Sequence, residues 1–82
     1  MSKTVDEPIT MLDPAVRDGG RFMWRDREHR IGTIGGRWSR RGRWWLGEGQ
    51  RRYFRITTLD NMAMDLCYDE LAQSWTVADM MD

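Results

Sequence analysis

The sequence contains almost none of the residues that build crosslinks and metal sites. Its one cysteine, Cys67, excludes an internal disulfide, and its one histidine, His29, excludes a two-histidine or cysteine–histidine metal cluster within one chain. The N-terminus lacks an apolar run, and no stretch approaches the roughly 18 apolar residues of a membrane span. We therefore expect a cytoplasmic protein with no cofactor and no membrane association.

Motifs for catalysis are also missing. Ser39 and Ser74 lie outside any nucleophile motif, and the single histidine would have to serve either of them. The glycines of HRIGTIGGRW match neither GxGxxG nor GxxxxGK[ST], the two patterns that bind phosphates. We therefore predict that the protein is not an enzyme.

Large side chains and unevenly placed charges are what the chain does have. Five Trp, two Tyr, two Phe and seven Met can fill the core of an 82-residue domain. The net charge is zero, but residues 17–55 hold twelve Arg against four acids, whereas residues 56–82 hold six acids and no base. This asymmetry indicates either a basic binding face or acidic and basic strands that neutralise each other by cross-strand pairs.

Alternation of apolar and polar residues predicts strands along most of the chain. Residues 1–16, which carry both prolines, are expected to form an extended arm, in which Ile9, Met11 and Leu12 could form a short edge strand. Residues 17–82 are expected to form a single small β domain. The expected order is a strand at 21–25, a turn at 26–28, a strand with a glycine bulge at 29–38, a turn at 39–43, a strand at 44–46, a loop at 47–50, a strand at 51–59, a tight turn at 60–61, a strand at 62–69, a loop at 70–73 and a last strand at 74–80.

The segment 60–73 also contains good helix formers. We favour a strand there because Met62, Met64, Leu66 and Tyr68 alternate strictly with the residues between them. The predicted fold is therefore all-β, a curled antiparallel meander of about six short strands that forms a small barrel of the SH3-like or half-open kind.

The stretch RWSRRGRWWL and the strand after it form the candidate binding site. Aromatic rings stack on bases, each worth roughly 1 to 3 kcal/mol, and arginines bind phosphates. The candidate residues are Arg37, Trp38, Arg40, Arg41, Arg43, Trp44, Trp45, Arg51, Arg52, Tyr53 and Arg55.

The alternative interpretation is that the tryptophans fill the core and the arginines are solvated. Adjacent residues of a strand point to opposite faces. We therefore expect Trp38 and one of Trp44 and Trp45 in the core and the other indole at the surface, without knowing which.

The order of several short motifs points to a known family. These motifs are DEPI near the start, RFMWRDREHRI, RW followed by RGRWW, RRYFRI, MDLCYDE and a closing W-x-V. Together they resemble a small uncharacterised bacterial domain family that occurs alone, beside, or fused to Y-family polymerase-like proteins of mutagenic DNA repair. The resemblance implies a link to translesion synthesis and carries over no catalytic residue. The chain ends in Met80-Met81-Asp82, where family members usually have an aromatic residue near a terminal Asp.

Two functions of different kinds follow from these features. The first is a binding module for single-stranded nucleic acid, or for a DNA-repair assembly, that uses the arginine- and tryptophan-rich face. The second is a protein-interaction adaptor that uses the basic face or an exposed edge strand. Self-association, in which the basic half of one chain covers the acidic half of another, is a third possibility.

Overall fold

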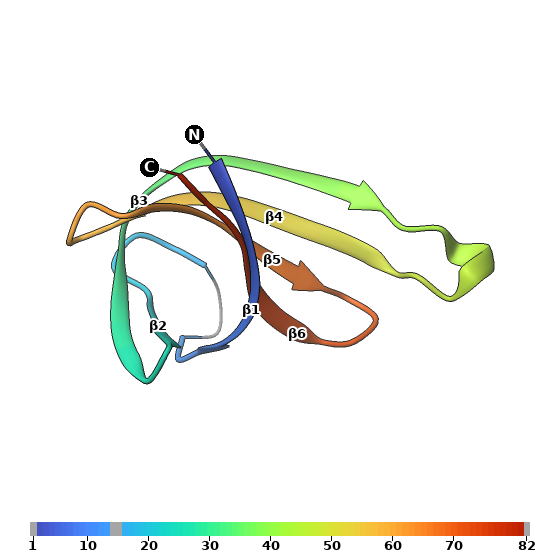
Figure 1. Ribbon diagram of the computed structural model, residues 1–82, viewed down its shortest axis with the longest axis horizontal. Coiled ribbons are helices and arrows are strands. Elements are labelled where there is room, and N and C mark those ends of the chain that lie inside the picture. Colours follow the sequence, from blue (N-terminus) through green and yellow to red (C-terminus); the bar gives the residue numbers. More distant parts are fainter. Residues whose placement is uncertain (1, 14–15, 82) are drawn as a thin grey trace.

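The computed structural model describes residues 2–13 and 16–81, with the side chains of 4–13, 16–43 and 45–81. Six strands and one short 3₁₀ helix follow one another: β1 Ser2–Met11, β2 Arg21–Trp24, β3 Arg27–Arg41, η1 Trp44–Leu46, β4 Gln50–Thr58, β5 Ala63–Asp69 and β6 Ser74–Met81. Each strand pairs antiparallel with the next, and β6 pairs with β1 to close a barrel (Figure 1). The predicted all-β meander is confirmed.

The segment that we expected to be an arm, residues 1–16, contributes a strand to this barrel. β1 pairs along β6 as far as Ile9 opposite Trp75, and then crosses to β2. Val5 and Ile9 pack against the core. Pro8 is tolerated because β1 has β6 on one side only at this point, and proline cannot donate to a second neighbour. Ser2–Met11 is therefore part of the β domain.

Three local predictions differ from the structure around β3. The turn expected at 26–28 is a two-residue turn at Arg25 and Asp26, whose φ values of 53° and 61° suit a tight hairpin. β3 continues to Arg41 through the turn expected at 39–43, because each residue there finds a partner on β4. The strand expected at 44–46 is the 3₁₀ helix η1.

The segment from 60 to 73 forms a strand and not a helix, as predicted. β5 lies between β4 and β6, and its alternate residues Met64 and Leu66 are fully buried. The turn before β5 contains Asn61 with a φ of 68°, which asparagine tolerates well. β5 is thus paired along both of its edges.

The core lies inside the barrel and is built from the alternate residues of its strands. Its fully buried members are Phe22, Ile31, Ile56, Met64, Leu66 and Val77. Trp24 is the buried tryptophan among the described side chains, and Trp75 packs against the core from β6. Trp38, expected in the core, is only half-buried and lies outside it.

The β3–β4 hairpin is longer than the barrel needs and extends away from it (Figure 1). Along β3, the pairing with β2 covers only Arg27–Arg30. Among the residues that the structure describes, no strand therefore pairs with the β2-side edge of β3 beyond Ile31, where Gly19 and Gly20 make the last backbone hydrogen bonds. We call residues 37–55 the ribbon.

Candidate binding surface on the ribbon

The cross-strand register divides the candidate residues between the two faces of the ribbon. Residues directly opposite each other in an antiparallel pair share a face. Trp38 lies opposite Tyr53, and Arg40 opposite Arg51, and these four share the outer face with Arg55. The other face, which continues the core side of the sheet, carries Arg37, Arg41, Arg52 and Phe54. The predicted set therefore forms two surfaces and not one.

The aromatic rings of the outer face are stacked on each other. Trp38 and Tyr53 lie nearly parallel, 5.5 Å apart with an interplanar angle of 6°. The guanidinium of Arg55 lies 5.3 Å from the Trp38 ring, and that of Arg40 lies 5.7 Å from the Tyr53 ring. Each ring thus contacts the other ring and a guanidinium. A base that extends this stack would therefore stack on a guanidinium and not on an aromatic ring.

Arginines of β4 are paired with acids of β5 and the turn after it. Arg55 donates from Nε to Oδ1 of Asp65 at 3.0 Å and from a terminal nitrogen to Oδ2 at 3.3 Å. This hydrogen bonding raises the pKa of Arg55. Further ion pairs join Arg52 to Glu70 at 2.7 Å and Arg51 to Asp69 at 3.7 Å. On β4, the expected neutralisation by cross-strand pairs therefore occurs.

The arginines of β3 are placed differently. In the part of the chain that the structure describes, Arg37, Arg40 and Arg41 have no carboxylate within ion-pair distance. All three are exposed. The positive charge available to a partner is therefore concentrated on β3.

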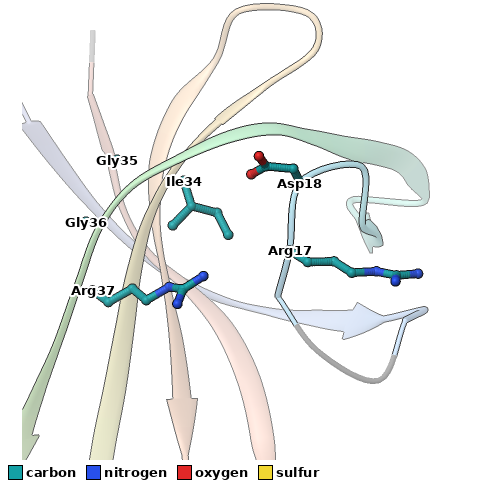
Figure 2. A pocket seen from close by; sticks show the side chains of 6 residues that line it. All are labelled: Arg17, Asp18, Ile34, Gly35, Gly36 and Arg37. Carbon is teal, nitrogen blue, oxygen red and sulfur yellow. The ribbon is translucent and has the colours of Figure 1, made fainter.

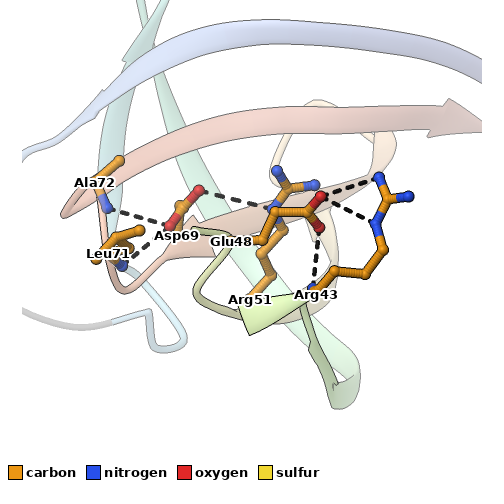
Figure 3. Close-up of polar contacts among 6 residues, drawn as sticks. All are labelled: Arg43, Glu48, Arg51, Asp69, Leu71 and Ala72. Atoms are coloured by element: carbon orange, nitrogen blue, oxygen red, sulfur yellow. Dashed lines mark hydrogen bonds and ion pairs between the residues drawn. The ribbon is translucent and has the colours of Figure 1, made fainter. Parts of the chain in front are cut away.

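Polar contacts fix the tip of the ribbon (Figure 3). Glu48 accepts hydrogen bonds from the backbone N–H of Arg43 and from its Nε, both at 3.1 Å, and these contacts lower the pKa of Glu48. Asp69 accepts from the backbone N–H groups of Leu71 and Ala72, which shapes the β5–β6 turn beside the tip. Arg43 is therefore a structural residue of the tip as well as a cation.

The tip presents apolar side chains to solvent. Trp45 is 65% exposed, and Leu46 is also exposed, as is Leu71 of the β5–β6 turn beside the tip. The side chain of Trp44 lies outside the described residues. Because η1 replaces the expected strand, the argument that one indole must enter the core does not hold for this segment.

Besides a pocket of about 500 Å³ that is lined by residues of the ribbon alone, two further pockets border the ribbon. One, of about 370 Å³, lies on the outer face and takes residues from five strands: Thr4, Asp6, Trp38, Arg40, Arg51, Tyr53, Arg55, Asp65, Ala78 and Asp79. The other, of about 710 Å³, lies beside the β3 bulge, where Arg37 extends toward the loop that carries Arg17 and Asp18 (Figure 2). Sequence reasoning missed Asp6 in the first pocket, because only the pairing of β1 with β6 brings it beside Asp79.

The described residues around the outer-face pocket include no activated nucleophile or metal site. Burial raises the pKa of the Cys67 thiol and that of the Tyr53 hydroxyl. The hydrogen bond between Arg51 and Tyr53 raises the pKa of Arg51. Within the described ranges, no group of three His, Cys, Asp or Glu side chains could hold a metal ion. Nor does any described helix have the length and apolar character to cross a membrane.

Comparison with known proteins identifies a family. The model of a family described as Domain of unknown function (DUF6504) matches residues 1–82. No curated protein and no solved structure matches the chain. The resemblance to an uncharacterised family is confirmed at this level, and the family description names no activity or partner.

Proposed function

The chain belongs to the DUF6504 family, and we propose that it is a non-enzymatic module that binds single-stranded nucleic acid through the ribbon. One observation carries the proposal. Residues 37–52 hold six arginines against one glutamate, and three of these arginines have no acidic partner among the described residues. Such a ribbon suits the phosphate backbone of a nucleic acid, because one guanidinium group can bind two phosphate oxygens at once.

The shape of the ribbon supports an extended partner. Arg40 and Arg51 reach out from one face, and Arg37 and Arg41 from the other, so cations line both sides of a narrow two-stranded element. Trp45 at the tip adds an exposed ring on which a base can stack. Binding would not depend on sequence where only phosphates are contacted.

The biological setting that we propose is a DNA-repair assembly. Its support is the resemblance to a family whose members occur beside or fused to Y-family polymerase-like proteins. A module that holds single-stranded DNA would suit such an assembly, because translesion synthesis works on an unpaired template.

The test measures fluorescence anisotropy of a labelled oligothymidine at low salt with the intact chain and with Arg37→Glu, Arg40→Glu and Arg41→Glu. Each variant is expected to weaken binding about tenfold and to reduce the salt slope by roughly 0.7 for each phosphate that the variant no longer binds. Arg43 is left intact because it holds Glu48 at the tip.

Arg30→Glu is the matched control, since Arg30 is exposed on the same strand but lies in the barrel. Its affinity is expected to match that of the unchanged protein. An anisotropy that stays constant at low salt, or an equal loss in Arg30→Glu, would contradict the proposal.

A second candidate, a protein-interaction adaptor, is favoured by a separate observation. The free edge of β3 runs beside the pocket that contains Ile34 and Arg37, and it ends near the apolar tip with Trp45 and Leu46. An acidic extended segment could add to this edge as a further strand. Two results together would favour this candidate: the protein fails to bind the oligothymidine, and it retains a protein partner after nuclease treatment.

A further inference from the structure

Two pairs of like charges stand at opposite ends of the outer-face pocket. Arg40 lies directly opposite Arg51 in the β3–β4 register, and Asp65 lies directly opposite Asp79 in the β5–β6 register. All four side chains line the pocket. Like charges placed directly opposite each other destabilise a sheet unless something compensates them.

Each pair is compensated within the chain on one side only. Both carboxylate oxygens of Asp65 accept hydrogen bonds from Arg55, and Arg51 pairs with Asp69. Among the described residues, Asp79 has no hydrogen bond and no ion pair within 4 Å, although it lies near enough to Arg55 to help raise the pKa of that guanidinium, and Arg40 has no carboxylate partner. One cation and one anion of the pocket are therefore left for a ligand.

The remaining charges define the ligand chemically. The end with Arg40 suits an anion, whereas the end with Asp79 suits a group with hydrogen-bond donors. The two ends lie four residues apart along the strands, about 13 Å at roughly 3.3 Å per residue. Arg40 on β3 and Asp79 on β6 are also three strand spacings of about 4.8 Å apart, and the long arginine side chains shorten this gap. Between them stands the stack of Trp38 and Tyr53 with its guanidinium ends. A planar group with a phosphate attached fits this order.

We propose that the pocket binds a guanine nucleotide of the bound strand. The guanine N1–H and exocyclic N2–H groups donate to the Asp79 carboxylate, and the phosphate accepts from Arg40 and Arg51 at the other end of the pocket. This assignment rests on the proposed function and gives the otherwise sequence-independent ribbon a base preference.

The hydrogen-bond donors of guanine favour it over the other bases. It is the base whose Watson–Crick edge presents two adjacent N–H donors, which match the two oxygens of one carboxylate. Adenine and cytosine offer one amino group beside an acceptor nitrogen, and that acceptor would face the negative Asp79. Asp6 also lines the pocket, has no ion pair within the described part of the chain, and adds negative charge at the same end.

The test compares three labelled pentanucleotides in which thymidines flank a central guanine, inosine or adenine. Inosine differs from guanine by the loss of the exocyclic amino group. The intact protein is expected to bind the guanine oligomer about tenfold more tightly than the inosine and adenine oligomers. This comparison needs no variant, so folding does not affect it.

Asp79→Asn then identifies the residue. Asparagine removes the repulsion with Asp65 and presents a donor to guanine, so the preference should disappear while oligothymidine binding is retained or strengthened. Asp26→Asn, in the exposed β2–β3 turn, is the matched control and should keep the preference.

The outcomes separate this inference from the proposed function. Equal binding of the guanine and inosine oligomers overturns the guanine assignment while the ribbon proposal stands. A preference that survives in Asp79→Asn overturns the role of Asp79. Failure to bind any oligomer overturns both the assignment and the nucleic-acid proposal. The same holds if a bound oligomer is displaced from the protein by a peptide with acidic and basic ends but not by guanosine monophosphate.

Discussion

Glu7 shows how much one residue can contribute to a small barrel. Its carboxylate accepts hydrogen bonds from Nε1 of the buried Trp24 at 3.0 Å and from two nitrogens of Arg25 at 2.8 and 2.7 Å. These contacts join β1 to the end of β2 and to the turn that follows. The hydrogen bond from Arg25, more than that from Trp24, lowers the pKa of Glu7 from 4.5 to about 2.

The shift in the pKa of Glu7 predicts a pH-dependent contribution to stability. Because the folded pKa lies below the unfolded value, the contribution is fully present above about pH 4.5 and is lost as the pH falls toward 2. Glu7→Gln should therefore lower the free energy of unfolding at pH 7, and its difference from the unchanged protein should shrink across this window. Urea denaturation at several pH values measures it.

Glu28→Gln is the matched control for this prediction. The nearest arginine nitrogen to Glu28 lies 3.9 Å away, and both side chains are about half exposed. Its effect on unfolding should be small at every pH. A constant difference between Glu7→Gln and the unchanged protein from pH 7 to pH 2 would show that the Arg25 contact does not stabilise the fold.

Among the elements, the ribbon tip depends on a close backbone approach. A Cβ atom at Gly49 would lie 2.5 Å from Cβ of Leu71 and 3.2 Å from its backbone nitrogen. Gly42 has a similar constraint, since a Cβ there would lie 2.5 Å from the carbonyl oxygen of Gly49. The tip therefore rests on the β5–β6 turn only because these positions lack side chains.

Gly49→Ala is expected to push the tip away from the β5–β6 turn. The overlap with Leu71 should lower the free energy of unfolding by about 1 to 3 kcal/mol. Gly35→Ala is the control, because its Cβ would meet only a backbone oxygen at 3.8 Å and should change stability by less than about 0.5 kcal/mol. Chemical denaturation of both variants checks the difference, and equal losses would show that the Leu71 contact is not limiting.

The strands that the sequence predicted best are those with one face in the core. Phe22 and Trp24 of β2, and Met64 and Leu66 of β5, alternate with more polar residues because one side of each strand meets the core. The ribbon has no such face beyond Phe54, so its composition carried no alternation, and SRRGR predicted a turn at 39–43 where β3 continues to Arg41. The bulge expected from the glycines of 29–38 is confirmed by the register shifts there. β1 was predicted only as a possible short edge strand near Ile9 and Met11, because Pro8 and the acids of the segment hide three residues that pack against the core.

The candidate site was predictable in composition but not in arrangement. The aromatic and basic residues were evident from the sequence, and the structure places Trp38, Tyr53, Arg40 and Arg55 in one stack. Their carboxylate neighbours could not be assigned, because a pair such as Arg55 and Asp65 depends on the register of two strands. A one-residue slip would move every side chain to the other face.

At the scale of the whole molecule, zero net charge conceals a division between paired and available charge. Asp65, Asp69 and Glu70, three of the six acids in residues 56–82, are paired with arginines of β4 and are therefore neutralised by a neighbouring strand. The available cations lie on β3 and extend from the barrel with the ribbon. A second copy of the chain therefore offers little free acidic surface to this ribbon.

This division predicts that the protein is a monomer even where electrostatic attraction is strongest. At about 0.01 M salt the Debye length is about 30 Å, so a basic ribbon would find an acidic surface on another copy if one were free. Sedimentation velocity should give the same monomeric mass at this salt concentration and at about 1 M. A dimer that dissociates as salt is added would instead show that the β4–β5 ion pairs exchange between molecules. Nucleic acid and a second copy would then compete for Arg37, Arg40 and Arg41, and oligothymidine should dissociate the dimer.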